Sequence, residues 1–422
     1  MNPGLRVVLL LLVSSLVVGL ATGAPFYYRL VYLWAFVLIG SWAMSKVALR
    51  GLSVSRTARS LRAQVGQVFE ERFEVVNNSR LLHLWLEVRD LSPLPGAHGS
   101  QVLSLLRGHE QRTYLIRTRL LQRGVFPLGD TVLASGDPFG LFPVNLRYPV
   151  EDSLLVYPLM VEVQFFHNPM GWLSGGEALR RRTHQITANA AGIREYEPGD
   201  SLNRIHWLST ARRNRLMSKE FELDPLADVW IFLDSARYVQ ASLPQEPVKL
   251  DSRDIWRPNV KIPMPPSTEE YGVSIAASLA RYYLRQNRSV GFVSAGQSLQ
   301  ILPSDRGGRQ LGKILEHLAL LRAHGELPLQ ALVEVEARNL ARGSTVVVIT
   351  PATGDSVILS IELLMRRGLF PIAVILDAAS FGGKPGTDDL IIKLTLLKVP
   401  VVRVANGDDL SATLTDGRNS HH

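Results

Sequence analysis

The sequence contains no cysteine, and this absence alone excludes several classes of protein. Disulfide-stabilised scaffolds, iron–sulfur proteins, Cys-ligated zinc sites and thiol nucleophiles all need a side chain that the chain lacks. The 10 histidines never form a His-Glu-x-x-His pair, which argues against a zinc hydrolase of that type. A composition of 46% hydrophobic and 20% charged residues excludes a disordered chain. The length of 422 residues suggests about two or three domains.

Acidic residues are missing from the first 62 positions, which contain seven basic residues. The rest of the chain is almost neutral, with 39 basic against 38 acidic residues. The net charge of +8 therefore describes the N-terminal segment and gives no global reason to expect a polyanionic partner. Basic clusters at 180–182 and 212–215 have acidic neighbours and no aromatic stacking platform, so we predict no binding of nucleic acid.

Two long uncharged runs in this segment predict a membrane hairpin. Val7 to Ala24 is one run of 18 residues, about 27 Å long as a helix, and Leu30 to Ser45 is the second. A short turn around residues 25–29 connects them. Aromatic residues stand near the expected interface depths, namely Tyr27, Tyr28, Trp34 and Trp42. We expect a transmembrane helical hairpin over residues 1–50, which contacts the lipid bilayer through residues 7–49.

Basic residues cluster directly after the second run, and they predict the orientation of the hairpin. They are Lys46, Arg50, Arg56, Arg59 and Arg62. The positive-inside rule therefore predicts a two-pass protein of the cytoplasmic membrane, with its remaining domains facing the cytoplasm. A cleaved signal peptide is the alternative, with Arg6, an apolar core and small residues at 21–24. The second run ends inside in either case.

Strand and turn patterns divide the rest of the chain into three parts and a tail. Residues 53–165 contain short alternating stretches separated by turns, which predict a β-sandwich of the immunoglobulin or fibronectin type. Residues 166–227 form a connecting segment. Residues 228–410 alternate apolar strands with helices, which predicts a doubly wound α/β domain with a parallel sheet. We expect the polar residues 411–422 to be a disordered tail.

The connecting segment contains a dense charged motif. Asp200 or Ser201 can cap a short helix in which Leu202, Ile205 and Leu208 recur three apart. His206 and Ser209 stand on the same helix as that cap. Three such neighbours rarely reach the geometry of nucleophile, base and orienting residue, so we predict no catalytic residue here.

This motif resembles that of the DUF58 family, a family defined by a domain of unknown function. The pattern is Arg-x-Tyr-x-Pro-Gly-Asp, then Arg-x-Ile-x-Trp, then Ala-Arg, then Leu before an extended acidic stretch. The matching residues are Arg194, Tyr196, Pro198, Gly199, Asp200, Arg204, Ile205, Trp207, Ala211, Arg212, Leu216 and Glu220. Position 206 is His, where the family more often has an acidic residue.

The resemblance implies a membrane-anchored protein of the bacterial inner membrane with a cytoplasmic von Willebrand factor A-like α/β domain. It also implies a protein partner, a MoxR-type AAA+ ATPase, in the assembly or maturation of an envelope or protein complex. We expect a non-enzymatic interaction or scaffold protein. The charged motif is then either a structural clasp or a partner-binding surface, formed by Arg194, Tyr196, Asp200, Arg204, Trp207 and Arg212.

A metal site is the main alternative, because the von Willebrand A-like fold binds Mg²⁺ through Asp-x-Ser-x-Ser. The chain has Asp234-Ser235-Ala236-Arg237-Tyr238, so two hydroxyl ligands are missing and a cation stands beside the site. Asp234, Ser235 and Asp355 are the remaining candidate ligands, and no other cofactor is expected. The alternative function is a Mg²⁺-dependent ligand-binding receptor or a hydrolase, which would use the Asp234 edge of the α/β domain, where Asp234 and Thr350 end their strands.

Overall fold

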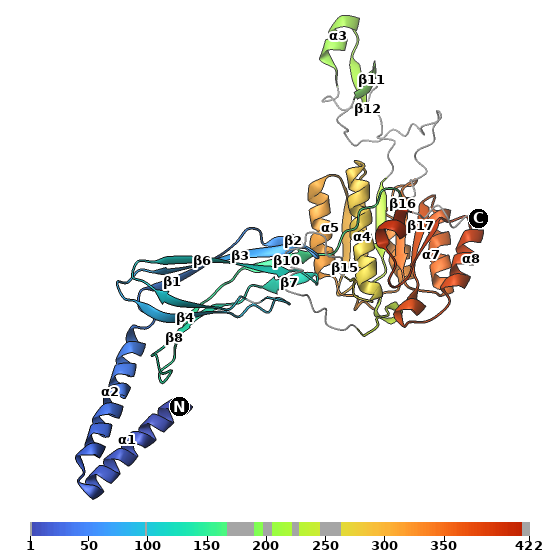
Figure 1. The fold of residues 1–422 in the computed structure, drawn as a ribbon. Helices are drawn as coiled ribbons and strands as arrows, with labels where there is room; N and C mark the ends of the chain where they lie inside the picture. Colours follow the sequence, from blue (N-terminus) through green and yellow to red (C-terminus); the bar gives the residue numbers. More distant parts are fainter. Residues whose placement is uncertain are drawn as a thin grey trace. The chain divides into compact units, whose positions relative to one another are not determined.

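The computed structural model describes residues 2–97, 99–166, 190–196, 205–221, 228–244 and 263–415. The chain divides into two units, which we describe one at a time. The first contains residues 1–159 and 247–263, and the second contains residues 160–246 and 264–422. Figure 1 shows the helices and strands of both units along the chain.

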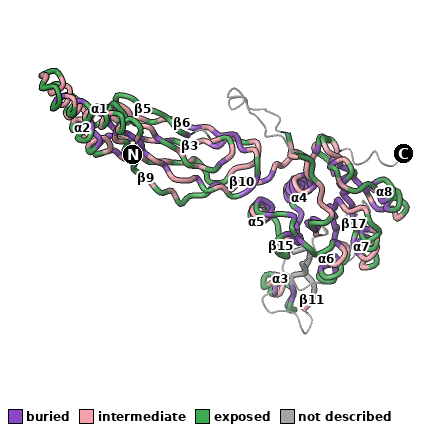
Figure 2. Tube along the Cα trace, turned by 90° about the horizontal axis from the view of Figure 1, so that it is seen from below, coloured by how far each residue is buried: buried purple, intermediate pink, exposed green. Residues whose placement is uncertain are grey.

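Two apolar helices begin the first unit, α1 (Pro3–Thr22) and α2 (Pro25–Val47). A proline in the first turn of each costs no hydrogen bond, and Gly23 ends α1 in the left-handed conformation with φ 64°. Each helix is long and apolar enough to cross a membrane, and only 11% of each apolar window is buried within the protein. Figure 2 accordingly shows both helices as mainly exposed or half-buried. The prediction of two apolar N-terminal helices is confirmed.

The strands described in the rest of the first unit are short and form three sheets. Their orders are β1-β3-β6, β5-β4-β8-β9 and β2-β10-β7, and all pairs are antiparallel except the pair of β2 and β10. The strands are β1 (Leu52–Ala58), β2 (Arg62–Gln64), β3 (Val68–Asn77), β4 (His83–Asp90), β5 (Gln101–Leu106), β6 (Gln111–Arg119), β7 (Gly124–Pro127), β8 (Thr131–Ser135), β9 (Val144–Tyr148) and β10 (Ser153–Tyr157).

The inner faces of the first two sheets share one buried core. Phe73 and Ile116 enter it from the β1-β3-β6 sheet, and Leu86, Leu106 and Leu133 enter it from the other. The strands alternate buried and exposed residues because successive side chains point to opposite faces. The strand-rich character expected for residues 53–165 is therefore present, with two layers of sheet in contact.

One charged cluster lies inside this strand-rich region. Arg56 Nε contacts Glu71 Oε1 at 2.8 Å, and its Nη1 contacts Asp90 Oδ1 at 3.1 Å, with both carboxylate side chains only 1% exposed. The Nη1 also donates to the carbonyl oxygens of Leu128 and Gly129. Arg56 is thus a buried structural residue, and its charge is neutralised. Arg56 is one of the five basic residues that follow the second apolar run. Because it is buried and paired, it does not act as a surface charge for the positive-inside rule.

The second unit contains a six-stranded sheet with the order β15-β14-β13-β16-β17-β18. Its strands are β13 (Val229–Leu233), β14 (Val290–Ala295), β15 (Leu299–Asp305), β16 (Thr345–Thr350), β17 (Phe370–Leu376) and β18 (Val401–Val404). Five strands are parallel, as expected, and the edge strand β15 is antiparallel to β14. The predicted parallel sheet thus has one additional strand, which is antiparallel because only residues 296–298 connect it to β14 and a parallel crossover needs a much longer connection.

Helices cover both faces of this sheet (Figure 1). On one face, Gly272 of α4 (Thr268–Arg285) approaches Leu233, Ile349 and Leu376 closely. On the other, α6 (Leu329–Glu336), α7 (Asp355–Arg366) and α8 (Thr387–Leu396) pack their apolar faces into the main core. The helix α5 (Gly308–Leu320) follows β15 and contacts α4. A mixed α/β domain is therefore present at residues 228–410.

A further helix, α9 (Leu410–Thr415), lies in the range that we expected to be a disordered tail. Leu410 and Leu414, four residues apart, are 3% and 0% exposed, so they anchor one face of the helix. The prediction is wrong for residues 411–415. Residues 416–422 lie outside the described part of the chain.

Candidate functional site

The described residues of the charged motif form two strands and a helix, which we call the β11–α3–β12 module. The strands β11 (Ala190–Glu195) and β12 (Met217–Phe221) pair antiparallel, and α3 (Trp207–Arg213) lies between them in the sequence. Hydrogen bonds extend this pairing beyond the strands, from Tyr196 N to Leu216 O at 2.8 Å and from His206 N to Met217 O at 2.8 Å.

The helix of this module starts later than its apolar spacing predicts. Ile205 is not helical, because it forms an antiparallel bridge with Ser218 and is only 6% exposed. His206 is the N-cap, and its Nδ1 accepts the backbone N–H of Ser209 at 3.2 Å. Asn214 then ends α3 in the left-handed conformation with φ 53°. The Oγ of Ser209 also lies 2.9 Å from His206 Nδ1. Both contacts with Ser209 belong to the helix cap, so His206 has a structural role here.

Four of the six motif residues lie in the described part of the chain. Arg194 is on β11 opposite Ser218, Tyr196 follows β11, Trp207 begins α3 and Arg212 stands in its last turn. Asp200 and Arg204 lie outside the described residues, so the charged clasp stays a prediction.

Large apolar side chains are exposed on this module beside arginines. Trp207 is 68% exposed, Leu208 is 60% exposed and Leu216 is 46% exposed. Arg212 and Arg213 in the last turn of α3 are also exposed. Exposed Trp and Arg side chains in one small region are the residue types that dominate binding energy at protein interfaces. The described residues of the module are therefore a candidate docking surface.

A second candidate lies in the α/β domain, at the carboxyl ends of β13 and β16. The strand order runs outward in opposite directions from this point, which is where ligands bind in sheets of this kind. Thr350 Oγ1 donates to Asp234 Oδ2 at 2.7 Å, and the backbone N–H of Ala236 donates to Asp234 Oδ1 at 3.2 Å. The sequence thus placed Asp234 and Thr350 at the right edge of the sheet.

Asp234 is a buried carboxyl group, and no basic side chain among the described residues forms an ion pair with it. Burial raises the pKa of Asp234 to about 6, and the hydrogen bonds from Thr350 and Ala236 act in the opposite direction. Gln240 Nε2 donates to the backbone carbonyl oxygen of Asp234 at 2.9 Å, and this bond holds the backbone that carries the carboxyl group. Such a carboxyl group can exchange a proton near neutral pH or accept a cation.

The other candidate metal ligands contact different partners. Ser235 is buried and its Oγ donates to the Leu233 carbonyl at 3.4 Å, whereas the exposed Asp355 pairs with Lys393 Nζ at 2.8 Å. Within the described residues, no group of three or more His, Asp or Glu side chains is arranged to hold a metal. A Mg²⁺ site with Asp234, Ser235 and Asp355 as ligands stays a prediction.

A further carboxylate at this edge was missed by sequence reasoning. Asp377 follows β17, contacts Arg403 Nη2 at 2.6 Å and accepts from Thr387 Oγ1 at 3.0 Å. Burial alone would raise the pKa of Asp377, but the hydrogen bonds from Arg403 and Thr387 outweigh it and lower the pKa. The available signal was an Asp directly after an apolar strand, the same pattern that identified Asp234.

Comparison with known proteins supports the DUF58 resemblance. The family described as "Protein of unknown function DUF58" matches residues 192–245, a range that includes α3, β12 and β13. The "Uncharacterized protein YeaD" of Bacillus subtilis (strain 168) is 26% identical over 239 residues. That match covers 55% of this chain, and the chain spans only 52% of that relative.

Likeness to solved structures is weak. The CARDB domain of a Pyrococcus furiosus protein has a TM-score of 0.19 and 13% identity, over 25% of this chain and 91% of that domain. A cycloisomaltooligosaccharide glucanotransferase of Paenibacillus sp. has a TM-score of 0.16 and 11% identity, over 84% of this chain and 53% of that enzyme. Values this low support no statement about fold or function.

Proposed function

We propose that this chain is a non-enzymatic, membrane-anchored interaction protein whose β11–α3–β12 module binds a cytoplasmic protein partner. The observation that carries the proposal is the exposure of Trp207 and Leu208 beside Arg212 and Arg213, within the segment that matches the DUF58 family. The family resemblance suggests that the partner is a MoxR-type AAA+ ATPase. The two would work together in the assembly or maturation of an envelope or protein complex.

The α/β domain and the strand-rich region have supporting roles in this proposal. The switch point between β13 and β16 and the antiparallel edge strand β15 favour a von Willebrand A-like fold for the α/β domain. The two contacting sheets of the first unit favour an immunoglobulin- or fibronectin-like spacer. Neither role requires a catalytic residue.

Replacing Trp207 and Leu208 by alanine tests the proposal. Removal of a central aromatic anchor costs about 2 kcal/mol or more at a protein interface, so the double variant should lose at least 10-fold of the co-purifying ATPase. Co-purification from mild detergent with quantitative mass spectrometry measures this loss. Leu396→Ala is the matched control, because Leu396 is an apolar residue on α8 with 79% exposure. Equal recovery of the ATPase with both variants would refute the role of the module.

A second candidate function uses the Asp234 edge as a Mg²⁺-dependent ligand-binding receptor or hydrolase. The specific observation in its favour is a buried carboxyl group at the switch point that forms no ion pair with a basic side chain among the described residues. Titration of the purified chain with Mg²⁺ by calorimetry distinguishes the two functions. The receptor or hydrolase requires a saturable signal that disappears in Asp234→Asn, whereas the interaction protein requires none.

The orientation in the membrane is a separate prediction. Because the chain has no cysteine, one introduced cysteine reports its location without interference. We expect Thr22→Cys, at the end of α1, to react with an impermeant maleimide on intact cells, and Ser298→Cys, on an exposed turn, to react only after lysis. Labelling of Ser298→Cys on intact cells would contradict a cytoplasmic location of the second unit.

A further inference from the structure

The segment of residues 160–166 packs along α4 in the second unit. Val161 N donates to Ser278 Oγ at 3.0 Å, and Arg281 Nη2 donates to the Val161 carbonyl at 2.7 Å. Further along, Phe166 N donates to Tyr282 OH at 3.1 Å, and the Phe166 side chain is 1% exposed. The segment is therefore hydrogen-bonded to α4 at both ends, and between them Glu162 O and Gln164 N form hydrogen bonds with Ser411 and Thr415 of α9.

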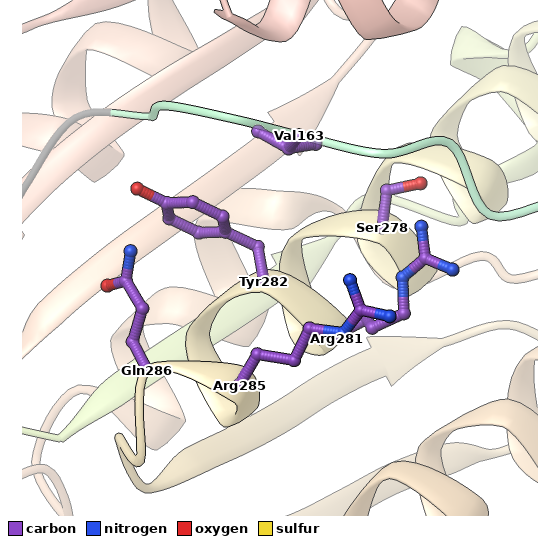
Figure 3. A pocket seen from close by; sticks show the side chains of 6 residues that line it. All are labelled: Val163, Ser278, Arg281, Tyr282, Arg285 and Gln286. Atoms are coloured by element: carbon purple, nitrogen blue, oxygen red, sulfur yellow. The ribbon is translucent and has the colours of Figure 1, made fainter.

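A hollow of about 200 Å³ lies under the middle of this segment (Figure 3). It is lined by Val163, Ser278, Arg281, Tyr282, Arg285 and Gln286. Figure 3 shows the Arg281 and Arg285 side chains extending on the same side of the hollow, with the Tyr282 ring and the Gln286 amide on the other side. A hollow of this size accommodates a phosphate group with a few attached carbon atoms.

The charges around the hollow favour an anion. Arg281 and Arg285 are four residues apart on α4, and two like charges at this spacing repel each other. Burial, then the neighbouring Arg285, lower the pKa of Arg281, while Glu162 acts in the opposite direction. The opposing carboxylate, Glu162, contacts Arg285 Nη1 at 3.0 Å, but both side chains are more than 60% exposed. Such an exposed pair contributes about 0–1 kcal/mol, so a bound anion can displace it.

The neutral groups of the hollow supply further donors. The Tyr282 hydroxyl oxygen already accepts the N–H of Phe166, which leaves its proton for donation. Ser278 has no proton left to donate, because its Oγ donates to the Ser274 carbonyl at 2.7 Å and accepts from Val161 N. Two guanidinium groups match the charge and the bidentate geometry of a phosphate dianion.

We propose that this hollow binds a small phosphomonoester, and that the bound phosphate group holds residues 160–166 on α4. The ligand is either a soluble molecule or the head group of a phosphatidic acid, since both present the same phosphate. The inference is independent of the proposed function, because it concerns a different part of the second unit from the β11–α3–β12 module.

Binding of glycerol 3-phosphate to the full chain in a nonionic detergent tests the proposal. We expect saturable binding by calorimetry, weakened at least 10-fold in Arg285→Gln, which removes the exposed pair with Glu162 and leaves the hydrogen bonds of Val161 and Phe166 to α4 intact. Arg281→Gln/Arg285→Gln should bind at least 100-fold more weakly. Arg366→Gln is the matched control, because it loses an exposed pair with Glu362 on α7 and should bind normally.

Hydrogen exchange provides the second readout and identifies the source of the phosphate. Bound ligand should slow exchange of the Val161, Gln164 and Phe166 amides. Protection by glycerol 3-phosphate indicates a soluble ligand, whereas protection only by mixed micelles with phosphatidic acid, and not phosphatidylcholine, indicates a lipid. If the folded chain binds neither probe saturably, or if Arg285→Gln binds as well as the unmodified chain, the proposal is wrong.

Discussion

Replacing Arg56 by methionine should destabilise the strand-rich region of the first unit by about 3–5 kcal/mol. Arg56 contacts both Glu71 and Asp90, and all three side chains are at most 5% exposed. Methionine has a similar length but leaves two carboxylates buried without a cation. Hydrogen exchange of the β3 and β6 core amides, which reports the opening free energy of this region alone, should accelerate roughly 100- to 4,000-fold.

The pH dependence of this variant has a definite sign. Burial raises the pKa of Glu71 and that of Asp90, and the Arg56 guanidinium opposes both shifts. Without Arg56 the two folded-state pKa values rise further, so the folded form binds more protons than the unfolded form. Stability is then greatest below the unfolded pKa values and falls as the pH rises through the folded ones. The destabilisation should therefore be smaller at pH 5 than at pH 8.

Arg117→Met is the matched control, because Arg117 pairs with Glu70 on the same sheet but both side chains are 32% exposed. This change should cost less than about 1 kcal/mol. The triple variant Arg56→Met, Glu71→Leu and Asp90→Leu should recover much of the lost stability, since well-packed apolar residues often replace a buried ion cluster without loss. Equal, small effects of Arg56→Met and Arg117→Met would show that the cluster does not stabilise this region.

Asp234→Asn should stabilise the second unit above pH 7 by up to about 3 kcal/mol, the equivalent of a pKa shift of about two units. The unmodified carboxyl group has a folded pKa of about 6 against an ordinary value of 3.8, because it is buried. Its contribution to stability is fully present below the unfolded pKa, is lost as the pH rises to about 6, and stays constant above that. Asparagine has no such loss, and its amide oxygen still accepts from Ala236.

Hydrogen exchange of the β13 and β16 amides between pH 4 and pH 8, corrected for intrinsic rates, measures this effect. The difference between Asp234→Asn and the unmodified chain should grow between about pH 4 and pH 6 and then remain constant. Asp355→Asn, at an exposed carboxylate paired with Lys393, is the control and should show no such step. A loss of stability in Asp234→Asn that grows as the pH rises would contradict the raised pKa, because it would mean that folding favours the ionised carboxylate.

Local sequence patterns were sufficient to predict the parallel sheet and the position of Asp234. Apolar strands alternating with helices indicated the parallel core of the sheet, and a carboxylate directly after a strand placed Asp234 beside Thr350. The edge strand β15 was missed, because none of its positions is buried and Pro303 stands within it, whereas a proline usually argues against a strand. The start of α3 was predicted too early, because apolar spacing cannot show that Ile205 is held by a strand.

Contacts between distant segments could not be predicted. Arg56 stands 15 residues from Glu71 and 34 from Asp90, and only the pairing of the sheets brings them together. The hollow on α4 needs the segment at Val161 to meet Arg281, 120 residues later. Single-sequence patterns contain no signal for such pairs, since neither partner departs from the ordinary composition of its own element.

Photo-cross-linking at position 208 in living cells tests whether the β11–α3–β12 module binds an AAA+ ATPase. A photoreactive amino acid in place of the exposed Leu208 samples whatever contacts the β11–α3–β12 module, and position 396 on α8 is the matched control. We expect a cross-link to an AAA+ ATPase from position 208 and none from position 396. Cross-links from position 208 only to lipid or to other segments of this chain, with the protein at normal abundance, would contradict this expectation.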